Sequence, residues 1–324
     1  MKDVVIGIDI GGTFTKYGLV DNKGNCLVEG SISTDKHESF EPYLKELYFT
    51  LEKLIEGKRE THQLRGIGIG APNGNYYTGS IEYAPNLKWK GIVNVVEEFK
   101  KYYEVPVVLT NDANAAALGE MLYGGAKGMS NFIVITLGTG LGSGIVVNGE
   151  VVYGHDGFAG ELGHINVKIR GRECGCGRRG CLETYVSATG IKRTIFRLLA
   201  ERIVDSELRG ISYENLTAKM VTNAALERDP IAIEAFEYTG KILGAKLADT
   251  MAHTSPEAFF LFGGLANAGD LLFDPTRRAL EDNLLPIYKG KVKVLPSGLQ
   301  DTNVAVLGSS ALIWNELKKL QEVI

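Results

Sequence analysis

Three of the chain's four cysteines lie within eight residues, at Cys174, Cys176 and Cys181 of the stretch CGCGRRGC, and His164 precedes them in GELGH. Three thiolates and one imidazole supply the four ligands of a closed tetrahedral zinc site, and the intervening glycines let a short loop wrap a metal. Free thiols are the alternative, although so polar a loop is poorly suited to burying thiols, and an iron–sulfur cluster usually requires four cysteines. The spacing predicts a structural zinc site without an open position for catalytic water.

Asp112 is the candidate general base. In TNDANAAALGE it follows a strand expected over 105–111 and opens a helix that begins at residue 112 or 113. Ligands of α/β proteins bind at the carboxyl ends of strands, so a carboxylate there is placed to take a proton. An ordinary helix N-cap explains Asp112 equally well. Glu161 and Glu183 flank the predicted metal ligands, which would fix their orientation.

The stretch DIGGTFTK at 9–16 is a candidate phosphate loop. Its glycines let backbone N–H groups approach an anion, its threonines add donors, and its lysine adds positive charge. These residues are Gly11, Gly12, Thr13, Thr15 and Lys16. The stretch fits neither the Walker nor the Rossmann pattern, and a plain glycine hairpin is the alternative.

A second glycine string, LGTGLGSG at 137–144, is weak on its own, because a dense hairpin bend explains it nearly as well. Two such loops together could bind a polyphosphate from both sides.

Apolar patterns give the elements that must position these groups. They predict strands over 4–10, 16–21, 26–32, 64–70, 105–111 and 258–264 and helices over 39–55, 230–253 and 303–320. The stretch 131–152 repeats the opening strand–glycine–strand pattern at a shift of 127 residues, with Gly138 on Gly11. Two similar α/β lobes would explain this repeat. Cys26 lies in a predicted strand, where we expect a buried free thiol.

Composition and net charge limit the classes of binding partner that the sequence predicts. The chain has 324 residues, 44% of them hydrophobic, and a net charge of −4, which gives no electrostatic reason to expect nucleic acid or an anionic membrane. No signal peptide or run of about 18 apolar residues is present in the sequence. We therefore expect a cytoplasmic protein that binds small molecules.

Together the motifs resemble the ROK family, the bacterial sugar kinases, related open reading frames and repressors of the actin-like hexokinase superfamily. The resemblance runs from GIDIGGTFTK through APNLKW, TNDANAAALGE, TLGTGLGSGIVVNGE, GELGH and CGCGRRGCLE to FGGLANAG. It implies an α/β, two-lobed, actin-like ATPase (ribonuclease H-like) fold with a cleft between the lobes. We expect residues 1–111 plus 306–324 to form a small lobe and residues 112–305 a large lobe that carries the zinc loop.

The resemblance also implies roles for individual residues. Asp112 would take the proton of a sugar 6-hydroxyl while that oxygen attacks the γ-phosphate of ATP. The implied sugar ligands, besides Asp112, are Asn86, Asn111, Glu161, His164 and Glu183. His164 would bind zinc through one ring nitrogen and the sugar through the other. The implied nucleotide ligands are the loops Gly11–Thr13 and Gly138–Thr139–Gly140, with Gly263 and Gly264 at the adenosine. Asp9 would position Mg²⁺ through water.

The expected function is an ATP-dependent hexose kinase that makes glucose 6-phosphate, with N-acetylglucosamine or N-acetylmannosamine kinase as the alternative. Asn73 stands where many relatives carry glycine, on the sugar side, and this leaves the choice of sugar open. A sugar-responsive repressor needs a DNA-reading module ahead of the sugar domain, yet the glycine strand begins at residue 4. A non-catalytic sugar-binding protein is the third alternative. Relatives commonly form dimers or tetramers, so a homo-oligomer is expected.

Overall fold

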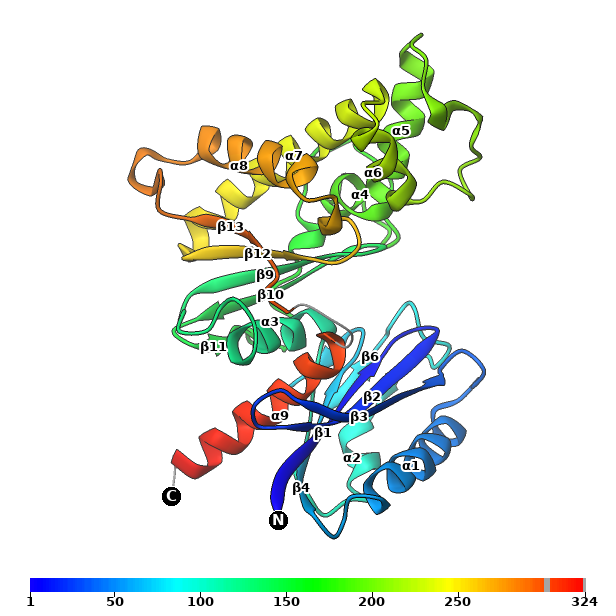
Figure 1. The fold of residues 1–324 in the computed structure, drawn as a ribbon, viewed down its shortest axis with the longest axis vertical. Helices are drawn as coiled ribbons and strands as arrows, with labels where there is room; N and C mark the ends of the chain where they lie inside the picture. The colour runs from blue at the N-terminus through cyan, green and yellow to red at the C-terminus, as the bar shows by residue number, and fades with distance from the viewer. Residues whose placement is uncertain (300–303, 323–324) are drawn as a thin grey trace. The chain divides into compact units, whose positions relative to one another are not determined.

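The computed structural model describes residues 1–299 and 304–322, which divide into two compact units (Figure 1). Unit 1 comprises Met1–Met129, Val151–Ala159 and Gly298–Ile324. Unit 2 comprises Ser130–Glu150 and Gly160–Ser297. The units therefore separate after Met129 and Ser297, whereas the sequence placed the lobe boundaries after residues 111 and 305.

Unit 1 is built on a five-stranded sheet of order β3-β2-β1-β4-β8. The strands are β1 (Lys2–Ile10), β2 (Phe14–Asp21), β3 (Cys26–Ser33), β4 (His62–Gly70) and β8 (Val107–Thr110). The hairpin strands β1, β2 and β3 pair antiparallel, while β4 is parallel to β1 and β8 is parallel to β4. The five strands predicted for this half are confirmed.

Helices cover both faces of this sheet. Helix α1 (Phe40–Glu56) buries Tyr43, Leu44, Leu47 and Leu51 at helical spacing, and the short α2 (Val95–Phe99) adds Val95 and Phe99 to the same core. On the other face, α9 (Val304–Glu322) comes so close to the sheet that a Cβ at Gly7 or Gly68 would collide with its backbone. Residue 303, where the sequence predicted this helix to begin, lies outside the described residues.

Helix α3 (Asp112–Leu122) explains where unit 1 ends. It packs against α9 and β4, both parts of unit 1. The contacts between α3 and α9 join segments almost two hundred residues apart, so the local sequence pattern gives no sign of them. A small sheet of β5 (Gly74–Asn75), β6 (Ser80–Glu82) and β7 (Ile92–Val93) also belongs to unit 1.

Unit 2 repeats the sheet of unit 1, with the strand order β11-β10-β9-β12-β13. The strands are β9 (Phe132–Leu137), β10 (Leu141–Val147), β11 (Glu150–Val151), β12 (Ala258–Phe262) and β13 (Lys293–Pro296). As in unit 1, the first two strands pair antiparallel and the last two add in parallel. The repeat inferred from the 127-residue shift is confirmed at the level of topology.

The helices of unit 2 bury the apolar face of this sheet. Ile133, Ile135 and Leu137 of β9 belong to one hydrophobic core with residues of α4 to α8. The helices are α4 (Glu183–Val186), α5 (Ala188–Glu201), α6 (Ala218–Leu226), α7 (Pro230–Thr254) and α8 (Asp270–Asn283), with short 3₁₀ turns at Leu162–His164, Glu207–Gly210, Ala266–Ala268 and Pro286–Tyr288. Helix α7 begins as its sequence predicts, with Pro230 in the first turn after the N-cap Asp229.

Two observations bear on sequence expectations. Cys26 is exposed, so the expectation of a buried thiol is wrong: the residue opens β3, the edge strand of its sheet. Among the helices of the described residues, none has both the length and the apolar character required to cross a membrane.

Candidate functional site

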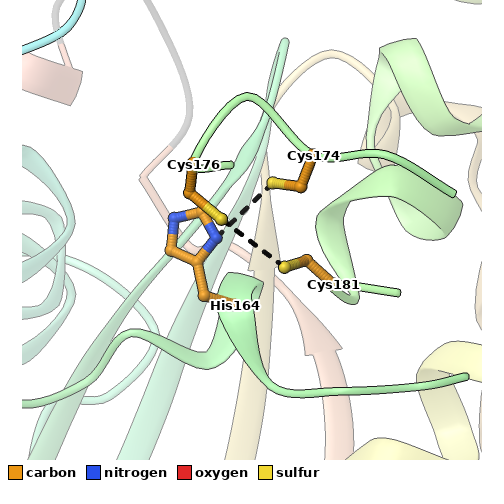
Figure 2. Close-up of side chains that lie close together, drawn as sticks. All are labelled: His164, Cys174, Cys176 and Cys181. Carbon is orange, nitrogen blue, oxygen red and sulfur yellow. Dashed lines mark hydrogen bonds between the residues drawn. The ribbon is translucent and has the colours of Figure 1, made fainter. Parts of the chain in front are cut away.

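The four predicted metal ligands converge in unit 2 (Figure 2). One nitrogen of His164 and the sulfurs of Cys174, Cys176 and Cys181 all lie within 4.8 Å of one another. Cys176 Sγ is 3.7 Å from Cys181 Sγ, and Cys174 Sγ is 3.7 Å from His164 Nδ1. Zinc–sulfur bonds of about 2.3 Å at tetrahedral angles place two sulfurs about 3.8 Å apart. The donors and their spacing therefore fit a tetrahedral metal site.

The cysteine loop is also anchored without a metal. The Arg172 guanidinium donates to the carbonyls of Thr184 and Gly190 at 2.7 and 3.0 Å, and to the Thr194 hydroxyl at 2.9 Å. It also lies over the Tyr185 ring, 4.6 Å from the centroid. Arg172 thus ties the start of the loop to α4 and α5, a role that the sequence analysis missed.

The two glycines of GELGH are required by the conformation and packing of the 3₁₀ turn at Leu162–His164. Gly160 has φ 98°, a conformation that L side chains rarely adopt. A Cβ at Gly163 would collide with the carbonyl of Leu141, so the 3₁₀ turn packs directly on β10. The turn that carries Glu161 and His164 is therefore held close to the strand.

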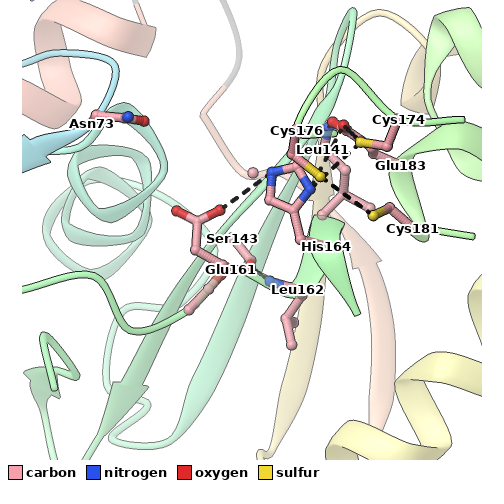
Figure 3. Close-up of polar contacts among 12 residues, drawn as sticks. Asn73, Leu141, Ser143, Glu161, Leu162, His164, Cys174, Cys176, Cys181 and Glu183 are labelled. Atoms are coloured by element: carbon pink, nitrogen blue, oxygen red, sulfur yellow. Dashed lines mark hydrogen bonds and ion pairs between the residues drawn. The ribbon is translucent and has the colours of Figure 1, made fainter. Parts of the chain in front are cut away.

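Buried Ser143 fixes the same turn from β10 (Figure 3). Its hydroxyl donates to the carbonyl of Gly160 and accepts from the N–H of Leu162 at 3.2 Å. The two bonded groups lie on either side of Glu161. Ser143 is thus a second supporting residue that the sequence analysis missed. In the sequence it is only one of the residues between the glycines of LGTGLGSG.

Glu161, His164 and Glu183 form a polar group beside the three cysteines of the predicted metal site (Figure 3). His164 Nδ1 is 3.8 Å from Glu183 Oε1, and Nε2 is 3.9 Å from Glu161 Oε2. Nδ1 faces the cysteines and Nε2 faces the other way, which is the division that a dual role for His164 requires. Glu183 Oε1 also accepts from Cys174 Sγ at 2.8 Å.

In unit 1, Asn111 takes the helix-capping role. Its side-chain oxygen accepts from the N–H of Asn114 at 2.7 Å, which makes Asn111 the N-cap of α3. Asp112 is the first helical residue, and its Oδ1 accepts from the N–H of Ala113 at 2.9 Å. The alternative that Asp112 is present as the N-cap is therefore wrong. The residue is exposed at the carboxyl end of β8.

Two carboxyl groups of unit 1, those of Asp9 and Asp112, have raised pKa values. Burial and the negative charge of Asp112 raise the pKa of Asp9 to about 7, and the opposing effect of Lys16 is smaller. Although Asp112 retains exposed surface, the protein atoms around its carboxyl desolvate it and raise its pKa, against the hydrogen bond from Ala113. Both groups therefore hold protons at a higher pH than ordinary aspartates, and a bound cation would favour their charged forms.

The first glycine loop lies between β1 and β2. Gly11 closes the turn by donating its N–H to the carbonyl of Phe14 at 3.0 Å, and Lys16 stands opposite Asp9 in the β-ladder. Gly12, Thr13 and Lys16 leave surface open to a ligand.

Thr15 does not meet the expectation that it binds nucleotide. It is fully buried, and its hydroxyl is 2.8 Å from both Thr34 Oγ1 and Tyr43 Oη. Because strand side chains alternate, Thr15 points into the core while its neighbours Phe14 and Lys16 are exposed.

Unit 2 brings its two glycine motifs to the same end of β9. The Gly138–Gly140 turn joins β9 to β10, and Gly138 donates to the carbonyl of Gly140 at 3.1 Å. Gly263, with φ 103°, packs so closely on Leu137 that a Cβ would lie 2.7 Å from its carbonyl oxygen. A Cβ at Gly138 or Gly264 would meet open space. Both segments thus leave space beside the backbone at one strand end, where an anion could approach.

The units divide the candidate residues between them. Unit 1 holds Asp9, Gly11, Gly12, Thr13, Lys16, Asn86, Asn111 and Asp112, and unit 2 holds Gly138, Thr139, Gly140, Glu161, His164, Cys174, Cys176, Cys181, Glu183, Gly263 and Gly264. Asn86 is exposed and lies against the first glycine loop, since a Cβ at Gly12 would come 2.6 Å from its carbonyl oxygen. Each unit therefore pairs a glycine loop with polar side chains suited to binding a sugar.

Comparison with known proteins gives one consistent result. A family model described as the ROK family matches residues 5–316. The chain is 37% identical to a glucokinase of Halalkalibacterium halodurans, covering 87% of this chain and 86% of the relative. It is 29% identical to a xylose repressor of Caldicellulosiruptor bescii, covering 99% of this chain and 81% of the repressor.

A solved structure extends this result to the fold. The crystal structure of a ROK family glucokinase from Streptomyces griseus, in complex with glucose and AMPPNP, is similar with a TM-score of 0.77 and 31% identity. The match covers 95% of this chain and 98% of that one. It confirms the predicted actin-like α/β fold class.

Proposed function

Since the chain belongs to the ROK family, we propose that it is an ATP-dependent hexose kinase whose preferred acceptor is glucose. The relatives that support this include a glucokinase at 37% identity and a glucokinase crystallised with glucose and an ATP analogue. A repressor is also among the relatives, so membership of the family does not by itself distinguish a sugar kinase from a sugar-responsive repressor. The arrangement at Asp112 favours catalysis.

In the proposed reaction, the Asp112 carboxylate accepts the proton of the sugar 6-hydroxyl. The oxygen forms a bond to the γ-phosphorus of ATP, the bond from that phosphorus to the β,γ-bridging oxygen breaks, and ADP leaves with the electron pair. Proton removal of this kind contributes about 10²–10⁴-fold, and most of the remaining catalysis comes from alignment and neutralisation of phosphate charge.

The other polar residues hold the reactants. Asn86, Asn111, Glu161, His164 and Glu183 would bind sugar hydroxyls. The amide nitrogen of Asn111 is suited to this because the helix cap uses its oxygen. The N–H groups and hydroxyls of the Gly11–Thr13 and Gly138–Gly140 turns would bind phosphate oxygens, with Lys16 adding charge and Gly263 and Gly264 beside the adenosine.

Two metals complete the proposal. Asp9 would hold Mg²⁺ through water, and its raised pKa fits a carboxylate that is fully charged only when a cation is near. Magnesium would supply charge neutralisation for the transferred phosphate. Zinc is the metal best suited to three sulfurs and one imidazole nitrogen, and with all four positions filled by protein it would hold structure.

One observation carries the kinase proposal. Asn111 caps α3, so Asp112 is not the helix cap and lies at a strand end with a carboxyl whose pKa is raised by desolvation. A protein that only binds sugar has no need of a base at this position, whereas a phosphoryl transfer to a hydroxyl does.

A sugar-panel assay tests the proposal. The protein is incubated with Mg·ATP and glucose, mannose, N-acetylglucosamine or N-acetylmannosamine, and ADP release is followed against a control without sugar. We expect the highest kcat/KM with glucose. Preference for an N-acetyl sugar would contradict the proposed acceptor, and no turnover with any hexose would contradict the kinase.

A further inference from the structure

Asn73 and Tyr83 lie in neighbouring segments of unit 1 and share an unusual backbone conformation. Their φ angles are 51° and 52°, in the left-handed region that few side chains other than asparagine adopt readily. The N–H of Glu82 donates to the carbonyl of Asn73 at 3.1 Å, which brings the two segments together. For a tyrosine this conformation is costly, so the surrounding structure must maintain it.

The Asn73 side chain supplies part of that support. Its Nδ2 donates to the carbonyl oxygen of Glu82 at 3.0 Å and reaches that of Tyr83 at 3.4 Å. A glycine at position 73 could adopt the same φ but would have no side chain to donate. The asparagine therefore adds a connection to the Glu82–Tyr83 backbone that glycine cannot make.

The segment held in this way carries Asn86. Tyr83 begins it, with its N–H donated to the carbonyl of Gly91 at 2.8 Å. Ala84 and Leu87 are buried in the core of unit 1, whereas Asn86 between them is exposed. At Asn86 the backbone lies against Gly12 of the glycine loop. Asn73 thus fixes one end of a short segment whose other end presents a polar side chain next to that loop.

We propose that Asn73 is a positioning residue, which fixes the backbone of residues 82–86 and thereby sets the affinity for the sugar. The inference rests on the proposed function, in which Asn86 binds a sugar hydroxyl. The Asn73 bonds are the same in the ground state and the transition state, so the effect belongs in KM and not in kcat.

Two substitutions remove the donor while preserving the backbone. Asn73→Gly permits the left-handed φ without strain, and Asn73→Asp keeps the size and tolerates this φ but presents only acceptors to the two carbonyls. The matched control is Asn148→Gly, an exposed asparagine with φ 53° in the turn after β10 of unit 2. It undergoes the same change of residue at a position outside the proposed site.

The measurement is KM and kcat for glucose and KM for ATP in all four proteins, with thermal unfolding to verify folding. We expect both Asn73 variants to raise the glucose KM about three- to tenfold, because they lose the exposed donor that bonds the carbonyls of Glu82 and Tyr83. We expect kcat and the ATP KM to stay within about twofold of the wild type. Asn148→Gly should match the wild type. Normal wild-type turnover with an unchanged glucose KM in both Asn73 variants would contradict this inference alone. Absence of hexose turnover in the wild type would contradict it together with the proposed function.

Discussion

The thiol of Cys174 donates a hydrogen bond to Glu183, with 2.8 Å between Sγ and Oε1. A predicted metal ligand and a proposed sugar ligand are therefore direct partners within unit 2. A metal-bound cysteine is a thiolate and has no proton to donate. Metal binding must break this hydrogen bond and leave the Glu183 oxygen to accept from another donor.

Metal removal should therefore weaken sugar binding. We expect chelated protein to show a glucose KM raised about tenfold or more, the usual scale for losing support of a site residue. Stoichiometric Zn²⁺ should restore the original value. Protein shown by elemental analysis to be metal-free, yet unchanged in glucose KM, would contradict the coupling.

Cys176→Ala tests the metal site without disturbing the core, because Cys176 is exposed. We expect bound zinc to fall from about one equivalent to near zero and the thermal midpoint to fall by about 5 °C or more, since 1 kcal/mol corresponds to about 2–4 °C in large domains. Cys26→Ala removes another exposed thiol and should change neither quantity. Equal stability of the two variants would argue against a structural metal.

Thr15→Val separates a core role from a nucleotide role. The substitution leaves the hydroxyls of Thr34 and Tyr43 without their shared partner, so we expect a loss of about 1–3 kcal/mol of unfolding free energy with an unchanged ATP KM. Thr13→Ala, at an exposed loop position, should instead raise the ATP KM and preserve stability. The opposite pattern in chemical denaturation and kinetics would restore Thr15 as a nucleotide ligand.

The raised pKa of Asp9 should appear in the pH dependence of stability. Its pKa is about 7 in the folded protein against about 3.9 in an unfolded chain, so between these values the folded state binds more protons. The contribution of Asp9 to stability is therefore present below about pH 4 and is lost as the pH rises through about 7.

Asp9→Asn removes this titration. Without Mg²⁺ or nucleotide, we expect the variant to gain unfolding free energy relative to the wild type as the pH is raised from 5 to 8. Parallel urea-denaturation series across this range measure the difference. A constant difference between the two proteins would mean that Asp9 has an ordinary pKa.

The parts of the fold that the sequence predicted are those governed by local pattern. Apolar patterns located the five strands of the first sheet and β12, and the shifted repeat indicated two sheets of like topology, whereas β13 and the small sheet β5–β6–β7 were not predicted. The cluster of His164 and three cysteines was also predictable, because a loop with three cysteines brings its thiols together over a short stretch of backbone. These features depend on neighbours in the chain.

The features that the sequence did not predict depend on contacts between distant segments or on the direction in which a side chain points. The packing of α3 on α9 keeps residues 112–129 in unit 1, and no local pattern shows that contact. Thr15 seemed available because it follows a glycine loop, yet the two-residue period of β2 already turns it inward. Ser143 and Arg172 act through backbone carbonyls, which residue type alone does not reveal.

The most direct test of the account is Asp112→Asn, followed by turnover and by calorimetric glucose binding on the same protein. An amide of the same shape can bind the sugar 6-hydroxyl but cannot accept its proton. We expect turnover to fall about 10²–10⁴-fold while the glucose Kd stays within about threefold of the wild type. Turnover retained within about tenfold of the wild type would show that Asp112 is not the base.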